Sequence, residues 1–309
     1  MTLRIVTGSA NHALALATAK GLGKELVTTE LERFPDGELR PVVGAIRGDD
    51  VYVIQPTCPP VNEHLVELLL LLDACGRAGA QRTTAVVPYF GYARQDRRTR
   101  PGQAIGARVA AEMIAAAGAD RLLVVDPHMP GFEAICRIPV EILTALPILA
   151  DAFGVEAEQH VVVAPDLGAV KLAERFAARW RLPVAVVRKR RMSDISVRAE
   201  DLVGEVGGRK VVIVDDMITT AATIEAATGL LIAEGAEPNA IVVAIHGLFV
   251  SAAKDRLGRL DLARLLVTDT VPAPKTAPAV EVCSIAPLLV KALGRLHREE
   301  QLDDLGVFD

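Results

Sequence analysis

The chain has 309 residues, enough for two domains on the usual scale of about 150 residues each. Hydrophobic residues make up 51% and charged residues 24%, which excludes a wholly disordered or fibrous protein. The formal net charge of −5 gives no overall attraction to nucleic acid or to an anionic membrane, so we expect neither as a partner and any polyanion site must be built locally.

Short β-branched runs alternate with Ala- and Leu-rich segments of helical period along the whole chain, which is typical of an α/β fold with mainly parallel sheets. In the first half we predict strands at Leu3–Thr7, Val51–Gln55, Thr83–Pro88 and Arg121–Asp126. The predicted helices between them are Asn11–Lys20, Val61–Ala78 and Ile105–Ala117.

In the second half we predict strands at His160–Ala164, Val184–Arg188, Lys210–Val214, Ile241–Ile245 and Ala263–Val267. Helices are predicted at Gly168–Arg179, Ala222–Ala233 and Ile285–His297. Each half has enough elements for its own sheet, so we expect one domain over residues 1–145 and a second over 146–284. The C-terminal helix, within residues 285–309, can pack back on the first domain.

The four cysteines form no CxxC pair and have no histidine nearby at zinc-ligand spacing, which indicates free thiols in a reducing compartment. The most apolar run, Leu68–Leu72, is bounded by Glu67 and Asp73 and falls far short of the roughly 20 residues that span a bilayer. The N-terminus carries no signal-peptide pattern, so the sequence predicts a cytoplasmic protein.

Polar residues follow three of the predicted strands at the point where each apolar run stops. Asp126 and His128 follow one strand, Asp166 follows the next half's first strand, and Asp215 with Asp216 follows a third. Ligands of open parallel sheets bind beyond the carboxyl ends of the strands, so these residues indicate a binding site. The alternative is that each Asp caps the helix or turn that comes after it.

The segment from Asp215 to Thr223 has the chemistry of a sugar-phosphate site. A buried strand delivers Asp215 and Asp216, and a turn rich in hydroxyl groups then opens a helix whose first N–H groups can bind an anion. The hydroxyls of Thr219, Thr220 and Thr223 can hold a phosphate, while the two carboxylates accept hydrogen bonds from ribose hydroxyls or hold a metal. The alternative is a capped helix without a ligand.

Two loops of the first half suit a nucleotide. Phe34 can stack on a purine while Asp36 and Glu38 accept hydrogen bonds, although Pro-Asp-Gly within this stretch is equally typical of a plain turn. Arg94 and Gln95 lie in a loop after a strand and can bind a triphosphate, the alternative being a solvated surface.

The run Arg188–Arg191 is densely cationic and is followed by no strong structural signal. It is compatible with a solvated surface or a nucleic-acid patch, but no aromatic residue interleaves it, which weakens the second interpretation. A mobile loop that brings Lys189 and Arg191 over a phosphoryl group fits both the charge and the lack of periodicity.

These stretches resemble motifs of the ribose-phosphate pyrophosphokinases, the enzymes that make phosphoribosyl pyrophosphate (PRPP), and they occur in the expected order along almost the whole chain. The matching stretches are the adenine-site loop 34–38, the ATP-binding stretch 88–97, the metal motif 126–128, the second metal-site loop 165–168, the basic triplet 189–191, the ribose-phosphate loop 211–224 and the tail 284–289. Residues 100–105 look like the archaeal-type variant of the family.

The resemblance implies two phosphoribosyltransferase-like domains, an N-terminal one with the ATP site and a C-terminal one that binds ribose phosphate. It implies transfer of the diphosphoryl group of ATP to ribose 5-phosphate, giving PRPP and AMP, by a homo-oligomer built from dimers. Mg²⁺ would be held by His128 and Asp166, and Lys189, Arg191 and His128 would act in catalysis. The implied ATP-binding residues are Phe34, Asp36, Glu38, Arg94, Gln95 and Asp96. The implied ribose 5-phosphate-binding residues are Asp215, Asp216, Thr219, Thr220, Ala221, Ala222 and Thr223.

The chain departs from the family pattern in its ribose-phosphate loop. Thr219 stands where an acid is usual, and Ala221 with Ala222 stands where at least one glycine is usual. A β-carbon in a left-handed conformation costs roughly 1–2 kcal/mol, and we expect the methyl of Ala222 to crowd the phosphate. Two alternatives therefore stay open: a non-catalytic or weakened paralogue that binds and regulates a true synthase, and a phosphoribosyltransferase that consumes PRPP.

Overall fold

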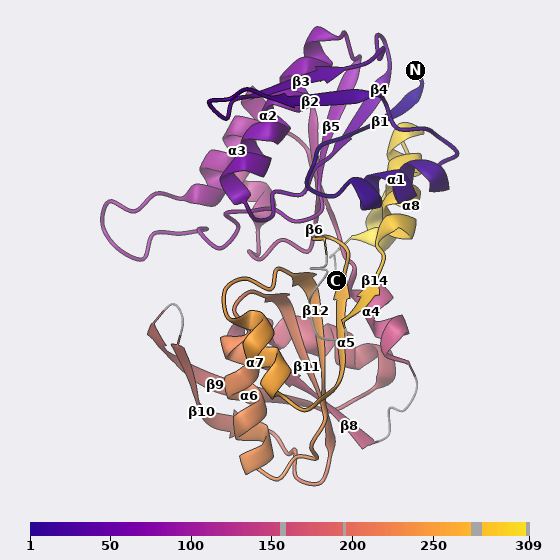
Figure 1. The fold of residues 1–309 in the computed structure, drawn as a ribbon. Helices are drawn as coiled ribbons and strands as arrows, with labels where there is room; N and C mark the ends of the chain where they lie inside the picture. The colour runs from indigo at the N-terminus through magenta and orange to yellow at the C-terminus, as the bar shows by residue number, and fades with distance from the viewer. Residues whose placement is uncertain (155–158, 194–195, 273–279, 307–309) are drawn as a thin grey trace. The chain divides into compact units, whose positions relative to one another are not determined.

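The computed structural model describes residues 1–154, 159–193, 196–272 and 280–306 (Figure 1). Contacts divide the chain into two compact units: unit 1 is Met1–Thr144 together with Ser284–Asp309, and unit 2 is Ala145–Cys283. Each unit contains a mainly parallel sheet flanked by helices, as the alternation of strand-like and helix-like segments predicts. The roles expected for the two predicted domains remain predictions.

Unit 1 is built on a five-stranded parallel sheet in the order β1-β4-β5-β6-β7. The strands are β1 (Leu3–Thr7), β4 (Asp50–Ile54), β5 (Arg82–Val87), β6 (Arg121–Val125) and β7 (Val140–Leu143). The helices are α1 (His12–Gly21), α2 (Val61–Arg77), α3 (Gly106–Ala116) and α8 (Ala286–His297), with 3-10 turns at Phe132–Ile135 and Asp303–Leu305. α1 packs against α8 on one side of the sheet, and α2 packs against α3 on the other (Figure 1). Because helices cover both faces, the central strands β4 and β5 are buried along nearly their whole length.

A separate antiparallel hairpin in unit 1 was not expected from the sequence. β2 (Thr29–Arg33) pairs with β3 (Leu39–Val43), and β3 packs against α2. The charged residues in β2 and the proline in β3 obscure the strand pattern, because Glu and Pro are both rare in strands.

Unit 2 contains a seven-stranded sheet in the order β10-β9-β8-β11-β12-β13-β14, in which only β9 and β10 pair antiparallel. The strands are β8 (His160–Ala164), β9 (Val184–Ser193), β10 (Ser196–Val203), β11 (Lys210–Ile218), β12 (Ala240–Gly247), β13 (Leu262–Thr268) and β14 (Glu281–Cys283). The helices are α4 (Leu146–Phe153), α5 (Val170–Trp180), α6 (Ala222–Ala233) and α7 (Ala253–Arg259), with a 3-10 turn at Leu167–Ala169. α4 packs against α5, and α6 packs against α7.

Two strands of unit 2, β9 and β11, continue well past their predicted ends. The strand predicted at Val184–Arg188 continues to Ser193 and pairs with β10, so Lys189 and Arg191 lie in a strand and not in the loop that we expected. Charged side chains hid this hairpin, because a strand with few apolar residues carries no signal of burial. The strand predicted at Lys210–Val214 continues to Ile218, because β12 goes on pairing with it.

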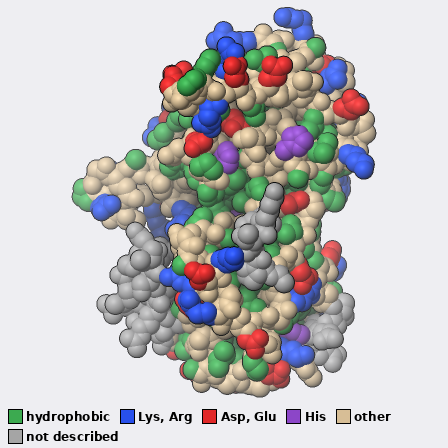
Figure 2. Space-filling model, in the orientation of Figure 1, with side chains coloured by type: hydrophobic (Ala, Val, Ile, Leu, Met, Phe, Trp, Pro, Cys, Tyr) green, Lys and Arg blue, Asp and Glu red, His purple; other side chains and the backbone are tan. Residues whose placement is uncertain are grey.

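No helix in the described ranges is both long and apolar enough to cross a bilayer. On the face of each unit that Figure 2 shows, acidic and basic side chains are interspersed among hydrophobic and uncharged ones. The visible surface of each unit therefore carries charges of both signs rather than one continuous patch.

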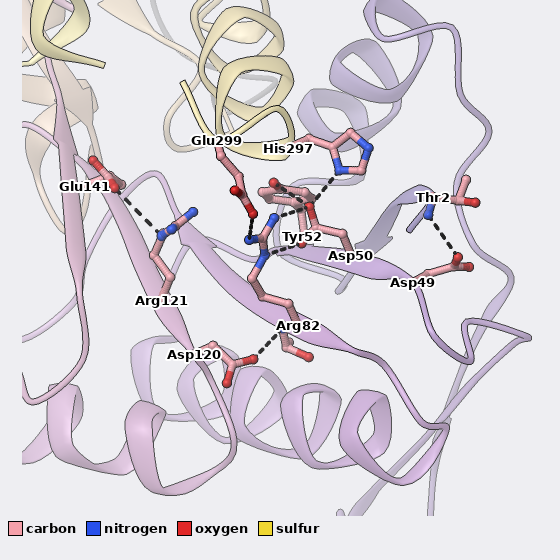
Figure 3. Close-up of polar contacts among 11 residues, drawn as sticks. Thr2, Asp49, Asp50, Tyr52, Arg82, Asp120, Arg121, Glu141, His297 and Glu299 are labelled. Carbon is pink, nitrogen blue, oxygen red and sulfur yellow. Dashed lines mark hydrogen bonds and ion pairs between the residues drawn. The ribbon is translucent and has the colours of Figure 1, made fainter. Parts of the chain in front are cut away.

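A buried carboxylate joins the last helix to the sheet of unit 1 (Figure 3). Asp50 is fully buried, and Arg82 donates to both of its oxygens at 2.8 Å. The hydroxyl of Tyr52 donates to Asp50 Oδ2 at 3.0 Å, and His297 Nδ1 at the end of α8 lies 2.8 Å from the same oxygen. Arg82 also lies 3.7 Å from Glu299. The network thus connects β4, β5 and the end of α8.

We expect Arg82→Met to lower the free energy of unfolding by about 3 kcal/mol or more, because it leaves the buried Asp50 carboxylate without its main counter-charge. The measurement is the midpoint of urea unfolding. Arg77→Met is the control, since Arg77 pairs with Asp73 on an exposed helix surface and such pairs contribute about 1 kcal/mol or less. Equal shifts of the two midpoints would show that the Asp50 pair contributes no more than a surface pair.

Candidate active site

The two predicted ribose-binding carboxylates lie on a one-sided extension of β11. β11 pairs with β8 only as far as Ile213, opposite Val163, whereas its pairing with β12 continues to Ile218, opposite Gly247. Asp215 and Asp216 are therefore part of the strand but lie beyond the last residue that pairs with β8. Both are half-buried, and the Asp216 N–H donates to Asp215 Oδ1 at 2.9 Å.

The turn after β11 is left-handed at an alanine. Ala221 has φ 59° and ψ 10°, and its carbonyl accepts the first helical hydrogen bond from the Glu225 N–H at 2.9 Å. Ala222 is the first residue of α6, so the strained residue is Ala221 and not the neighbour whose methyl we expected to crowd the phosphate. Alanine has no side-chain acceptor, so Ala221 cannot cap α6 as Ser or Asp would. The turn thus presents the helix N-terminus without a side-chain cap from this position.

Two residues outside every sequence motif bind the same turn. The Val250 N–H donates to the Thr219 carbonyl at 2.9 Å, and Arg256 Nη1 donates to the Thr220 carbonyl at 2.9 Å. Arg256 lies 36 residues from its partner in sequence, and no motif or spacing could have indicated the contact.

Asp166, the predicted metal ligand of unit 2, caps the 3-10 turn after β8. Its Oδ1 accepts hydrogen bonds from the N–H groups of Gly168 at 2.8 Å and Ala169 at 3.2 Å. The capping alternative weighed for the Asp residues therefore holds at this position. Capping does not exclude metal binding, because a carboxylate has two oxygens and this cap uses Oδ1.

The predicted catalytic cations lie on the β9–β10 hairpin. Lys189 is opposite Ala199 and Arg191 is opposite Val197 in the strand register. Side chains alternate between the faces of a strand, so positions 189 and 191 share one face and position 190 has the other. The side chains at these three positions lie outside the described part of the structure.

The predicted adenine-site residues form the tip of the β2–β3 hairpin. The Gly37 N–H donates to the Phe34 carbonyl and the Phe34 N–H donates to the Glu38 carbonyl, both at 2.9 Å. Asp36 Oδ1 accepts from the Glu38 N–H at 3.1 Å, so the turn chemistry expected of Pro-Asp-Gly is present. Asp36 and Glu38 are exposed, and the guanidinium of Arg40 lies 4.9 Å from the centre of the half-buried Phe34 ring.

The second predicted ATP loop follows the carboxyl end of β5 in the five-stranded sheet of unit 1. Arg94 and Gln95 are exposed, and Asp96 is partly exposed. The Gln95 N–H donates to the Tyr92 carbonyl at 2.8 Å. The Ala107 N–H at the start of α3 donates to the Gln95 carbonyl at 3.3 Å. The loop is thus held by its backbone while its polar side chains face solvent.

His128 is exposed just beyond the carboxyl end of β6, where Asp126 is buried in a left-handed conformation with φ 38°. In the described ranges, no group of three or more His, Cys, Asp or Glu side chains is arranged to hold a metal ion. His128 belongs to unit 1 and Asp166 to unit 2.

Comparison with known proteins identifies the family. The chain matches the N-terminal domain of ribose phosphate pyrophosphokinase over residues 3–118 and the phosphoribosyl synthetase-associated domain over residues 195–306. The ribose-phosphate pyrophosphokinases of Gloeobacter violaceus and Aquifex aeolicus are each 40% identical to it, over 98% of this chain and 92% and 98% of theirs. The chain belongs to the ribose-phosphate pyrophosphokinase family.

A solved member of the family has the same fold. The crystal structure of phosphoribosylpyrophosphate synthetase from Mycobacterium smegmatis matches with a TM-score of 0.90 and 34% identity, covering 97% of this chain and 100% of that one. The family, the α/β fold of parallel sheets flanked by helices, and the transferase class that makes PRPP are thereby confirmed. The roles of the individual site residues and of Mg²⁺ remain predictions.

We expect Ala221→Gly to stabilise the protein, because removing strain of roughly 1–2 kcal/mol outweighs the 0.4–1 kcal/mol of extra freedom that glycine gives the unfolded chain. Ala222→Gly, the matched control inside α6, should instead destabilise it by up to about 1 kcal/mol. Opposite shifts of the two urea midpoints are the expected result. Destabilisation by both variants would show that the left-handed alanine carries no strain.

Proposed function

We propose that this member of the ribose-phosphate pyrophosphokinase family transfers the β,γ-diphosphoryl group of ATP to the C1 hydroxyl of ribose 5-phosphate. The observation that carries the proposal is the extension of β11, which presents Asp215 and Asp216 directly before a left-handed turn and the N-terminus of α6. Carboxylates for ribose hydroxyls and backbone N–H groups for a phosphate thus follow one another within a few residues.

In the proposed complex, the 5-phosphate binds the turn and the first N–H groups of α6. Thr219, Thr220 and Thr223 add hydroxyl donors, and Ala221 and Ala222 contribute backbone N–H groups only. Asp215 and Asp216 accept hydrogen bonds from the vicinal ribose hydroxyls. This orients the C1 hydroxyl for attack, which is the main contribution an enzyme makes to phosphoryl transfer.

ATP binding is assigned to the two exposed loops of unit 1. The ring of Phe34 offers a surface for the purine, and Asp36 and Glu38 offer acceptors for its amino group or for the ribose. Arg94 and Gln95, with Asp96 beside them, supply the cation and amide for the triphosphate.

The residues present fit a Mg²⁺ ion shared with the substrate. Mg²⁺ in nucleotide sites is bound by one or two protein groups plus phosphate oxygens and water, and the described residues offer no closed protein cage. We assign His128 and Asp166 to this ion. When bound, Mg²⁺ neutralises triphosphate charge and polarises the phosphorus that is attacked.

The reaction forms a bond between the C1 oxygen and the β-phosphorus, and it breaks the bond from that phosphorus to the oxygen bridging to the α-phosphorus. AMP leaves with the bridging oxygen, and the proton of the C1 hydroxyl is released to water. Lys189 and Arg191 are assigned to the negative charge that develops on the transferring and leaving oxygens. His128 can also donate to a phosphate oxygen when it is not bound to metal.

We further propose that the protein is cytoplasmic and forms a homo-oligomer built from dimers. The proposed assembly rests on the resemblance to the family alone, and sedimentation of the purified protein would measure it.

The activity itself is the first test of this function. Incubation with ATP, ribose 5-phosphate and Mg²⁺ should give equal amounts of AMP and PRPP, and omission of any one of the three should abolish both, because the proposed transfer needs all of them. Chromatographic quantification of AMP and PRPP checks this. Binding of either substrate without AMP formation would support the weakened-paralogue alternative, and PRPP consumption with a free base would support a phosphoribosyltransferase.

A second test separates binding from chemistry on the β9–β10 hairpin. Charge-stabilising cations in phosphoryl transfer contribute about 10³- to 10⁵-fold in rate, so Lys189→Ala and Arg191→Ala should each lower kcat by a factor of about 10³. The KM for ATP should change much less, because the loops of unit 1 still bind the nucleotide. Arg190→Ala is the matched control, since position 190 has the opposite face of β9. Near-normal turnover of the first two variants would contradict the catalytic assignment.

A further inference from the structure

Arg256 on α7 contacts the ribose-phosphate turn from a part of the chain that no motif includes. Its guanidinium donates through Nη1 to the Thr220 carbonyl at 2.9 Å and lies 3.1 Å from the Glu225 carboxylate through Nε. The Arg256 side chain is only 18% exposed, whereas that of Glu225 is 38% exposed, so the guanidinium is largely shielded from water although its carboxylate partner is not. Arg256 therefore links the turn, the first helical turn of α6, and α7.

The geometry of the peptide group gives this contact a consequence for ligand binding. In a trans peptide the carbonyl and the following N–H point in opposite directions, and the peptides on either side of Thr220 are trans. The Thr219 carbonyl is bound by the Val250 N–H, and the Thr220 carbonyl is bound by Arg256. Both donors belong to one segment of the chain, so the N–H groups of Thr220 and Ala221 are turned away from that segment.

The turn has a specific need for such a constraint. Ala221 is left-handed, and a left-handed residue after a turn lets successive N–H groups converge into an anion-binding concavity. The peptide between Thr220 and Ala221 would lose this arrangement if it rotated to bring its carbonyl toward the ligand. The hydrogen bond from Arg256 opposes that rotation, because it holds the carbonyl on the other side.

We propose that Arg256 is a positioning residue for the sugar-phosphate subsite: by binding the Thr220 carbonyl it keeps the Ala221 N–H directed at the 5-phosphate. This inference rests on the proposed function of the turn and assigns to it a residue that does not touch the substrate. Arg256 thus acts on ribose 5-phosphate binding, and we expect ATP binding, which is assigned to the loops of unit 1, to be unaffected.

The test compares Arg256→Met with Arg259→Met. Arg259 is the matched control, because it also lies on α7 and pairs with Glu225 at 3.0 Å, but within the described part of the chain it donates no hydrogen bond to the turn. Loss of a hydrogen bond from a charged donor corresponds to about tenfold or more in affinity, so Arg256→Met should raise the KM for ribose 5-phosphate about tenfold or more. The KM for ATP and kcat at saturating substrates should stay within about threefold of wild type, and Arg259→Met should leave all three constants within that range.

Arg256→Lys provides a conservative rescue, because a lysine ammonium can still donate to the Thr220 carbonyl and pair with Glu225. Its KM for ribose 5-phosphate should lie between those of the wild type and Arg256→Met. Calorimetric titration with ribose 5-phosphate alone should show the same order of affinities, and this readout does not need turnover. A wild type that binds ribose 5-phosphate but forms no AMP would refute the proposed function while leaving the inference standing.

The inference would be overturned if the wild type binds ribose 5-phosphate and Arg256→Met binds it equally well. It would also be overturned if Arg256→Met and Arg259→Met lose affinity together, or if the KM for ATP rises and kcat falls along with the rise in the KM for ribose 5-phosphate, since those results indicate general packing of α7.

Discussion

The carboxylate of Asp50 is fully buried and is bound from its own strand, from the next strand and from the last helix of the chain. Tyr52 on β4, Arg82 at the start of β5 and His297 at the end of α8 all contact it. A second contact also involves the C-terminal segment, because the Thr144 N–H donates to the Leu305 carbonyl at 2.9 Å. Unit 1 is therefore built from both ends of the chain, with unit 2 inserted in sequence between Thr144 and Ser284, and the sheet of unit 1 cannot complete its contacts before the C-terminal segment is made.

The charge on Asp50 links this arrangement to pH. Burial by itself raises the pKa of the carboxyl, but the hydrogen bonds from Arg82 and His297 outweigh burial and hold the pKa below its ordinary value of 3.8. The same contact raises the pKa of Arg82, which stays charged at all relevant pH. Since the folded pKa is the lower one, the stabilisation is present above about pH 3.8 and is lost as the pH falls through the folded value. Acidification should therefore weaken the contact between α8 and the sheet, because protonated Asp50 no longer pairs with Arg82.

The sequence was most informative for the elements that lie in the buried core. The Val-rich strands β8 and β11 and the helix α6 could be predicted because a sheet covered on both faces needs continuous apolar runs. The β9–β10 hairpin could not, since a strand that carries Lys189 and Arg191 shows no apolar alternation and is stabilised by its partner instead. The continuation of β11 through Asp215 was equally hidden, because it depends on β12 pairing beyond the end of β8.

In the candidate site too, the sequence reveals residues that are close along the chain but not those that come together only in the fold. Residues 215–223 could be recognised because the chemistry is contiguous, whereas Arg256 could not, because its role comes from a contact across 36 residues. The two kinds of information meet at Ala221. Glycine would reach the left-handed conformation at no steric cost but would leave the preceding peptide freer to rotate. With alanine the backbone has fewer conformations, and bonds to the Thr219 and Thr220 carbonyls select among them. Alanine in place of glycine is therefore compatible with a preorganised turn in which the hydrogen bonds to the Thr219 and Thr220 carbonyls offset the backbone strain at Ala221.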